Sequence, residues 1–356
     1  MDLLKEITQL SHEFGTPEYL KGGGGNTSAK NAETLWIKPS GTSLLDMKPE
    51  LFVALDRARL GVLYEGQPPA DPTEREAWVK ATMLAAVREG SKGRPSVEAP
   101  LHNLMAGAYV VHTHPALVNG MTSGKTGPKA CGRLFPDALW VDYGDPGFTV
   151  CIKLLEAVRK YRKDHHREPP AIFLGNHGVF VGDDNADAVR AAYQVMMEKL
   201  KAEYRKARVA MELKVGPAPA AAEGESIRAR VAQVLGAEHA QAVAGSGSFA
   251  IAQGPVSPDQ IVYMRSYPLM GEPTEAALRA FENTHRHSPR VVVTANGVFG
   301  LGSSEKNAGL ALELALDAAL VRQLADAFGG IRYMTPSESG FIDNWEVEAY
   351  RRKMMK

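Results

Sequence analysis

Cysteine is scarce in this sequence, since Cys131 and Cys151 are the only two among 356 residues. Two cysteines exclude a framework of several disulfides, and no cysteine cluster suggests zinc held by thiolates. An excess of charge is also lacking, because Lys and Arg together number 41 and Asp and Glu together number 41. This balance argues against a chain built to bind polyanions such as nucleic acids, although it is compatible with a local basic patch.

Long apolar runs are absent as well. No stretch approaches the length needed to span a bilayer, and the amphipathic start of the chain lacks the apolar core of a signal peptide. A hydrophobic share of 44% and a charged share of 23% are typical of a soluble globular protein. The length allows one large domain or two modest ones. We therefore expect a cytoplasmic protein without membrane or nucleic-acid partners.

The most informative stretch is an apolar strand, predicted from residue 109, that ends in His112, Thr113 and His114. Side chains alternate across a strand, so both histidines leave on one face, within reach of one ion. A lone buried histidine is more often a hydrogen-bonded core residue, but two imidazoles on one face favour a ligand role. Glu98 lies upstream on a predicted helix, and His177 follows another predicted strand.

Three neutral imidazoles with one open position resemble the ligand set of catalytic zinc sites. The spacing alone does not rule out iron, cobalt or manganese. A carboxylate beside such a metal suits proton transfer at a carbon next to a carbonyl. An isolated glutamate in the first turn of a helix would instead be explained by the helix dipole.

Two loops carry the chemistry of anion binding. Four consecutive glycines end at Gly25 and are followed by Asn26, and Ser40 and Gly41 lie in a second loop after the next strand. Glycine-rich backbone can direct several N–H groups at one phosphate. The alternative is a flexible hairpin tip, and the recurrence of the pattern favours phosphate. A sequence at residues 119–126 that superficially resembles a nucleotide-binding P-loop has the wrong spacing and no preceding strand.

Hydrophobic spacing and turn residues predict an alternation of helices and strands, which favours an α/β fold. A proline-rich and alanine-rich linker is expected at 216–224, between a catalytic domain at 1–215 and a C-terminal α/β extension at 225–356. The segment around Asn296 echoes that around His177 at an offset of 119 positions. We interpret the extension as a degenerate repeat without a metal site, against the alternative of a chance match. The predicted elements are helices at 3–14, 74–89, 147–164, 183–209 and 227–235, and strands at 34–38, 51–55, 139–143, 171–174 and 179–181.

Five segments together resemble the class II aldolase/adducin family over residues 1–210. They are Gly25-Asn26-Thr27-Ser28, Lys38-Pro39-Ser40-Gly41-Thr42, Glu98 with His102, His112-Thr113-His114 and Asn176-His177-Gly178. The sequence is most similar to the aldolase portion of bifunctional rhamnulose-phosphate aldolase/short-chain dehydrogenase proteins, and we expect the dehydrogenase part to be absent. The resemblance implies an α/β/α sandwich with a central, mainly antiparallel sheet, and a homo-oligomer, commonly a tetramer.

The resemblance also implies a function. The family's members include zinc-dependent aldolases that cleave a ketose 1-phosphate, such as rhamnulose or fuculose 1-phosphate, into dihydroxyacetone phosphate and an aldehyde through a metal-stabilised enediolate. Sugar-phosphate dehydratases or decarboxylases are the alternative, followed by a non-enzymatic scaffold of the adducin type. By position, His112, His114 and His177 match the zinc ligands, Glu98 matches the catalytic acid/base, and Gly25, Asn26, Ser40, Gly41 and Ser96 match the phosphate site. Val97 departs from the family's second serine, which removes one phosphate donor.

Overall fold

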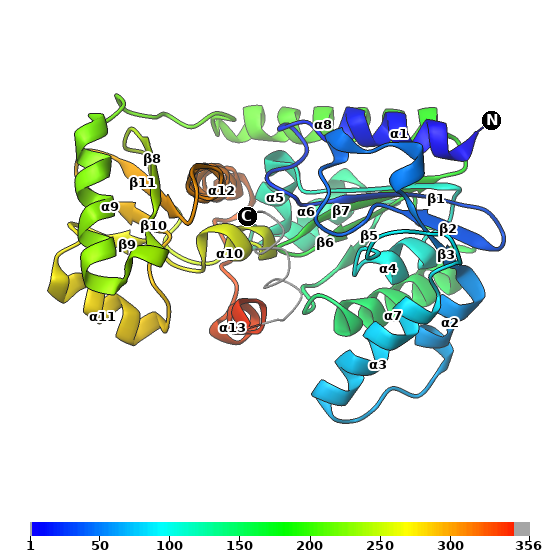
Figure 1. Ribbon diagram of the computed structural model, residues 1–356. Helices are drawn as coiled ribbons and strands as arrows, with labels where there is room; N and C mark the ends of the chain where they lie inside the picture. The colour runs from blue at the N-terminus through cyan, green and yellow to red at the C-terminus, as the bar shows by residue number, and fades with distance from the viewer. Residues whose placement is uncertain (1, 345–356) are drawn as a thin grey trace. The chain divides into compact units, whose positions relative to one another are not determined.

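The computed structural model describes residues 2–344 of the chain, and its first part is built on a seven-stranded sheet (Figure 1). All neighbouring strands are antiparallel except β5 and β6, which are parallel. This confirms the expected α/β class with a mainly antiparallel central sheet. In sheet order the strands are β3 (Val53–Asp56), β2 (Thr34–Ile37), β1 (Asn26–Lys30), β4 (Tyr109–Thr113), β7 (Gly178–Asp183), β6 (Ala171–Leu174) and β5 (Leu139–Val141).

Helices cover both faces of this sheet. Figure 1 shows α1 (Leu3–Phe14) and α8 (Ala186–Ala207) on one face and α2, α3, α4 and α7 on the other. In α1, Ile7, Leu10 and Phe14 are buried at helical spacing, and the Asp2 side chain accepts a hydrogen bond from Leu4 N–H at the N-cap. The remaining helices that precede β6 along the chain are α2 (Arg57–Glu65), α3 (Pro72–Ala85), α4 (Ala99–Leu104), α5 (Ala116–Thr122), α6 (Gly127–Leu134) and α7 (Phe148–His165).

Local predictions failed where the hydrophobic signal is weak. Helix α2 lies between the predicted strand at 51–55 and the predicted helix at 74–89, where no element was predicted. It was missed because it contains Gly61 and buries only Leu60 and Leu63. Helix α4 begins at Ala99, so Glu98 is its N-cap residue and does not lie in the first turn as expected. The structure agrees with the rejection of a P-loop, because a helix, α5, precedes the Gly-Lys-Thr segment, whereas a strand precedes a P-loop.

The chain divides into two compact units. One unit holds the residues up to Val118 together with Thr126–Ala202, and the other holds Asn119–Lys125 together with the chain from Glu203 onward. The second unit contains a four-stranded sheet in the order β8 (Ala242–Ser246), β11 (Val298–Gly302), β10 (Val291–Val293) and β9 (Leu269–Met270). Its helices are α9 (Ala221–Leu235), α10 (Pro258–Met264), α11 (Glu275–His285), α12 (Glu305–Leu324) and α13 (Pro336–Asn344). Helix α9 therefore begins inside the predicted linker.

The four-stranded sheet repeats the arrangement of half of the larger sheet. The order β8-β11-β10-β9 parallels β4-β7-β6-β5, and in both sets only the last two strands are parallel. Along the chain, α9, α10, α11 and α12 alternate with these strands as α4, α5, α7 and α8 do with theirs, and α6 is the additional helix of the first set. The registers also correspond, since Tyr109 pairs with Asp183 and Ala242 pairs with Gly302 at equivalent strand ends.

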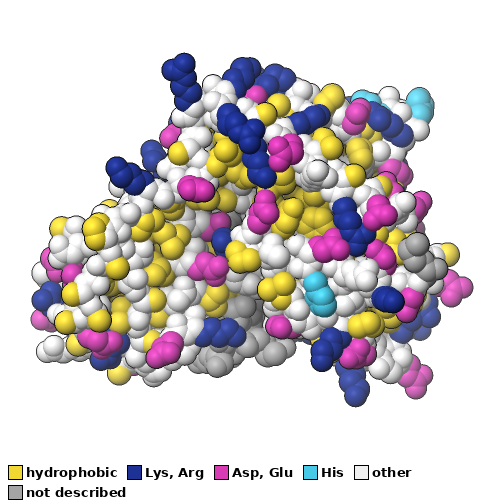
Figure 2. Space-filling view, turned by 90° about the horizontal axis from the view of Figure 1, so that it is seen from above, with side chains coloured by type: hydrophobic (Ala, Val, Ile, Leu, Met, Phe, Trp, Pro, Cys, Tyr) yellow, Lys and Arg dark blue, Asp and Glu magenta, His cyan; other side chains and the backbone are white. Residues whose placement is uncertain are grey.

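Charge is mixed over the face drawn in Figure 2, where basic and acidic side chains are interspersed. Among the described residues, none of the helices has the length and hydropathy that crossing a membrane requires.

Candidate functional site

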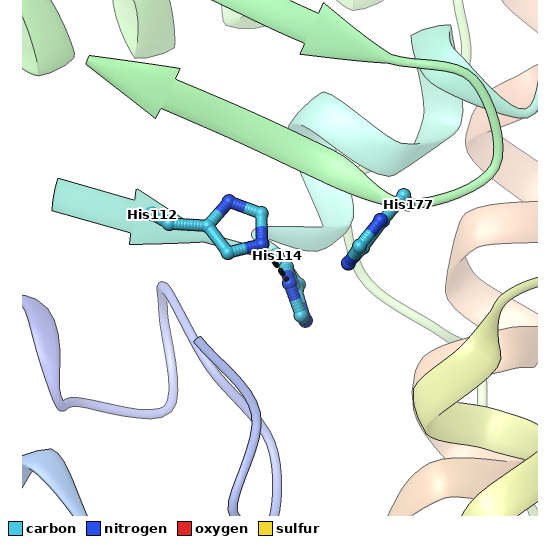
Figure 3. A group of neighbouring side chains, drawn as sticks. All are labelled: His112, His114 and His177. Atoms are coloured by element: carbon cyan, nitrogen blue, oxygen red, sulfur yellow. Dashed lines mark hydrogen bonds between the residues drawn. The ribbon is translucent and has the colours of Figure 1, made fainter. Parts of the chain in front are cut away.

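The three predicted histidines converge at one end of the seven-stranded sheet. His112 is on β4, His114 lies just beyond the end of that strand, and His177 lies in the turn between β6 and β7 (Figure 3). Strand β4 pairs directly with β7, which brings the turn beside the end of β4. One ligand atom from each of the three histidines lies within 4.8 Å of the others, and all three residues are buried.

His112 is fixed in a single orientation. Its Nδ1 lies 3.0 Å from the Val179 carbonyl oxygen, and its ring stacks on Phe180 with a centroid separation of 3.7 Å. Because a carbonyl only accepts, Nδ1 carries the proton and Nε2 presents a lone pair. The Nε2 of His114 lies 2.9 Å from this atom. A hydrogen bond to the second ring nitrogen is the usual way in which a protein orients a metal-binding histidine.

The β6–β7 turn is shaped to present His177. Asn176 adopts a left-handed backbone conformation with φ of 52°, which asparagine tolerates better than most residues. Gly178 follows, and a Cβ there would lie 2.4 Å from Thr113 O and 2.5 Å from His114 Cδ2. The absence of a side chain at Gly178 thus allows His114 and the β6–β7 turn to approach each other.

Glu98, the N-cap residue of α4, completes the cluster. Its Oε1 lies 3.4 Å from Nε2 of His112 and 3.4 Å from Nε2 of His177. Its Oε2 accepts a hydrogen bond from the Asn26 amide nitrogen, and its own N–H donates to Ser96 Oγ at 3.2 Å. Glu98 is only 6% exposed, so its position is set by these protein contacts.

The ionisation states suit a base beside neutral ligands. Burial acts to raise the pKa of Glu98, but the charge and hydrogen bonding of His112, with the charge of His177, hold it well below the ordinary value. Burial lowers the pKa of His112. Neutral imidazoles bind a metal but no longer lower the pKa of Glu98, so the positive charge of a bound metal would be what keeps Glu98 a carboxylate beside them.

These residues fit a transition metal. Zinc–nitrogen bonds of about 2.0–2.1 Å place two ligand nitrogens no more than about 4.2 Å apart, close to the spread of the three histidines. Three imidazole nitrogens form the donor set, and Glu98 Oε1 is near enough to two of them to act as a further ligand. Imidazole also suits iron, copper and nickel, so the donor set does not identify the metal.

The predicted phosphate-binding residues lie in three segments, which are Gly25 with Asn26 at the start of β1, Ser40 with Gly41 after β2, and Ser96 just before Glu98. Gly25 has φ of 66°, and a Cβ there would contact Leu20 and His112 O at under 3 Å, so only glycine fits beside the histidine strand. Ser96 and Asn26 both bond to Glu98, as described. The Ser40 loop reaches the same region, since Ser40 N donates to Arg94 O at 2.8 Å.

Gly41 in that loop has φ of 84°, and Lys38 Nζ donates to Thr42 O at 2.7 Å. Pro39 is bridged to Pro95, next to Ser96. The structure thus places the second glycine loop beside the segment that leads to Glu98. The contact between Asn26 and Glu98 was not foreseen, because the two residues are 72 positions apart.

The sequence also matches the model of a known protein family. The model of the class II aldolase and adducin N-terminal domain matches residues 5–204. The chain belongs to this family. No curated protein matches the chain. Class II aldolases are metal-dependent, and the buried histidine triad of this member is a group that can bind a metal.

Solved structures of the same family also match. The N-terminal class II aldolase domain of a conserved protein from Thermoplasma acidophilum has 20% identity and a TM-score of 0.48, covering 57% of this chain and 93% of that one. YgbL from Klebsiella pneumoniae, described as a putative aldolase/epimerase/decarboxylase, has 17% identity and a TM-score of 0.40, with 56% and 87% covered. L-fuculose-1-phosphate aldolase from Thermus thermophilus has 14% identity and a TM-score of 0.37, with 56% and 92% covered.

Proposed function

We propose that this protein is a metal-dependent aldolase that reversibly cleaves a ketose 1-phosphate, of the rhamnulose or fuculose 1-phosphate type, into dihydroxyacetone phosphate and an aldehyde. The observation that carries the proposal is the position of Glu98, whose Oε1 is 3.4 Å from the Nε2 atoms of two clustered histidines. A buried carboxylate beside a three-histidine donor set is the arrangement that proton transfer next to a metal-bound carbonyl requires.

His112, His114 and His177 are the proposed ligands, and zinc is the proposed metal, with another divalent transition metal as the alternative. When bound, the metal supplies a Lewis acid that stabilises negative charge on the substrate oxygens. In the cleavage direction the hydroxyl on the fourth ketose carbon loses its proton and becomes the aldehyde carbonyl, the bond between the third and fourth carbons breaks, and its electron pair forms an enediolate with the ketone carbonyl. Glu98, once it has taken up a proton, delivers it to the third carbon, so the proton lost at oxygen is regained at carbon. In the reverse direction Glu98 removes that proton from dihydroxyacetone phosphate.

Substrate binding is assigned to the two glycine loops. Backbone N–H groups and short side chains of the loops are suited to hold the phosphate and so fix the reacting carbons relative to Glu98. The proposed residues are Gly25, Asn26, Ser40, Gly41 and Ser96. The hydrogen bonds of Asn26 and Ser96 to Glu98 support this assignment. The bond from Ser40 N to Arg94 O, two residues before Ser96, supports it as well.

The test is to measure metal content and aldol cleavage over a panel of ketose 1-phosphates for the wild type and His177→Ala. We expect the wild type to hold metal and to release dihydroxyacetone phosphate, and the variant to lose both. Mass spectrometry of the products distinguishes the alternatives, since a dehydratase releases water and a decarboxylase releases carbon dioxide. A protein without bound metal, unaffected by a chelator, would instead be a scaffold of the adducin type.

The C-terminal region is proposed to be a degenerate repeat without a metal site, following a catalytic domain at 1–215 and a linker at 216–224. The strand registers support this, because Gly245 and Gly247 occupy the positions that correspond to His112 and His114. Asn296 precedes Gly297 as His177 precedes Gly178, and it donates to Glu223 at 2.9 Å. We expect one metal ion per chain, and a second ion that persists in His177→Ala would contradict the repeat proposal.

Three further assignments follow from the sequence. The likeness to the aldolase portion of rhamnulose-phosphate aldolase/dehydrogenase proteins is a proposal for the substrate class. A homo-oligomer, with a tetramer favoured, is proposed from the family resemblance, and a cytoplasmic location is proposed from the composition. Sedimentation equilibrium measures the oligomeric state directly.

A further inference from the structure

One face of strand β1 is polar throughout although the strand is buried. Asn26, Ser28 and Lys30 alternate along β1 and so point to the same side, and all five residues of the strand are buried. Each of the three side chains hydrogen-bonds to Glu98 or to helix α4. Asn26 Nδ2 donates to Glu98 Oε2, Ser28 Oγ lies 2.7 Å from His102 Nδ1, and Lys30 Nζ donates to His102 O at 2.9 Å. We call Asn26, Ser28 and Lys30 the β1 ladder.

Helix α4 needs external support because it has only six residues. Helices this short are not stable by themselves, so their position depends on tertiary contacts. The β1 ladder supplies contacts along the whole helix, from Glu98 at the N-cap to the His102 carbonyl in the last turn. That carbonyl is among the last four of the helix, which have no partner within it, and a cation is favourable there.

The polar residues of this contact cost stability. His102 is fully buried, and its Nε2 has no hydrogen-bond partner among residues 2–344. A buried polar atom without a partner is destabilising, and a leucine would fill similar space without that cost. Burial lowers the pKa of Lys30 to about 7, so its charged form is also disfavoured. Stability alone does not explain why these residues occupy the contact.

We propose that Ser28, Lys30 and His102 are positioning residues that hold helix α4 in register with β1, and thereby place the Glu98 carboxylate beside the three histidines. The effect on catalysis rests on the proposed aldolase function, whereas the effect on the position of Glu98 does not. Strand β1 pairs with β4 in a register that sets Asn26 opposite His112. The β1 ladder therefore fixes the Glu98 carboxylate relative to β4, the strand that carries His112 and ends one residue before His114.

The opposite face of β1 supplies a matched control. Ser11 of α1 is fully buried, and its Oγ lies 2.6 Å from Thr27 Oγ1, on the side of β1 that faces away from α4. Ser11→Ala and Ser28→Ala therefore make the same chemical change at fully buried hydroxyls on opposite faces of β1, although Ser11 lies in α1 and also donates to Ile7 O at 2.7 Å. Only Ser28→Ala alters the contact with α4.

The experiment compares Ser11→Ala, Ser28→Ala and Ser28→Thr with the wild type. We expect the two alanine variants to lower the melting temperature by similar amounts and to keep the wild-type metal content. Ser28→Ala should lower kcat by about 10- to 100-fold with little change in KM, because a displacement of about 1 Å at a reacting group has effects of this size. Ser11→Ala should leave kcat unchanged, and Ser28→Thr, which keeps the hydroxyl, should recover most of the activity.

A crystal structure of Ser28→Ala tests the positioning without reference to turnover. The Glu98 carboxylate should be displaced from the histidines in this variant and unmoved in Ser11→Ala. The proposal is overturned if Glu98 keeps its position in Ser28→Ala, or if both alanine variants change kcat equally. If the wild type cleaves no ketose 1-phosphate while Glu98 shifts as expected, the proposed reaction fails and the positioning role stands.

Discussion

The close approach at Gly178 makes a quantitative prediction about the metal site. A Cβ added there would lie 2.4 Å from Thr113 O and 2.5 Å from His114 Cδ2, whereas an ordinary contact is 3.4–4 Å. Gly178→Ala must therefore move the β6–β7 turn away from the end of β4 by about 1 Å. Overpacking of this kind costs about 1–3 kcal/mol. For a unit of roughly 200 residues this corresponds to a melting temperature lower by about 2–12 °C.

The same displacement acts on the proposed metal ligands. Ligand distances in metal sites are held to within about 0.2 Å, so a shift of about 1 Å between His114 and His177 should weaken metal binding by at least tenfold. Competition with a chromophoric chelator measures this affinity, and differential scanning calorimetry measures the stability. We expect both quantities to fall together.

Gly61→Ala is the matched control for this substitution. Gly61 lies inside α2, and a Cβ there would meet nothing within 4 Å. Replacing a helical glycine by alanine should stabilise the protein by about 0.5–1 kcal/mol and leave metal affinity unchanged. If Gly178→Ala melts like the wild type and binds metal equally well, the close packing described at the end of β4 does not constrain the site.

Three other outcomes are expected. If a metal binds the folded chain alone, each tenfold rise in its free concentration above Kd should add about 1.4 kcal/mol, or about 3–6 °C in Tm, and a chelator should remove the gain; a Tm independent of metal would refute this. Burial holds the pKa of His102 well below its ordinary value. Below about pH 6.5 only the unfolded chain binds this proton, so the free energy of unfolding decreases as the pH is lowered, by at most about 1.4 kcal/mol per pH unit. Urea unfolding at several pH values should show a smaller decrease in the free energy of unfolding for His102→Leu than for the wild type. Equal decreases would contradict a neutral His102 in the folded protein. Asn176→Ala should lower stability by about 1–2 kcal/mol because of its positive φ, whereas Asn176→Gly should be tolerated, and equal Tm values for the two would count against strain at this turn.

Much of the candidate site follows from the sequence because its signals are local. Alternation along one strand suffices to place His112 and His114 together, and a glycine-flanked turn marks His177. The α/β class and the mainly antiparallel sheet were also predicted correctly. Helix α2 was missed because it is short, buries only two leucines and contains a glycine.

The contacts that position Glu98 could not be predicted in this way. Asn26 and Ser28 lie more than 70 residues before their partners, and only the β1–β4 pairing brings them to α4. The available signal was the run of polar residues at the start of β1, Asn26-Thr27-Ser28, which was interpreted as part of a phosphate loop. The correspondence of Gly245 with His112 was equally hidden, since it depends on strand register and not on a shared motif.

The two hairpins that end the repeated segments differ in length. Three residues separate Leu174 from its partner Gly178, whereas two separate Thr294 from Gly297, which it pairs with through a 2.9 Å hydrogen bond. A point substitution at Asn296 therefore cannot recreate the geometry that presents His177, because an inserted residue is also required. An imidazole placed at position 296 would be presented by a turn one residue shorter than the turn that presents His177.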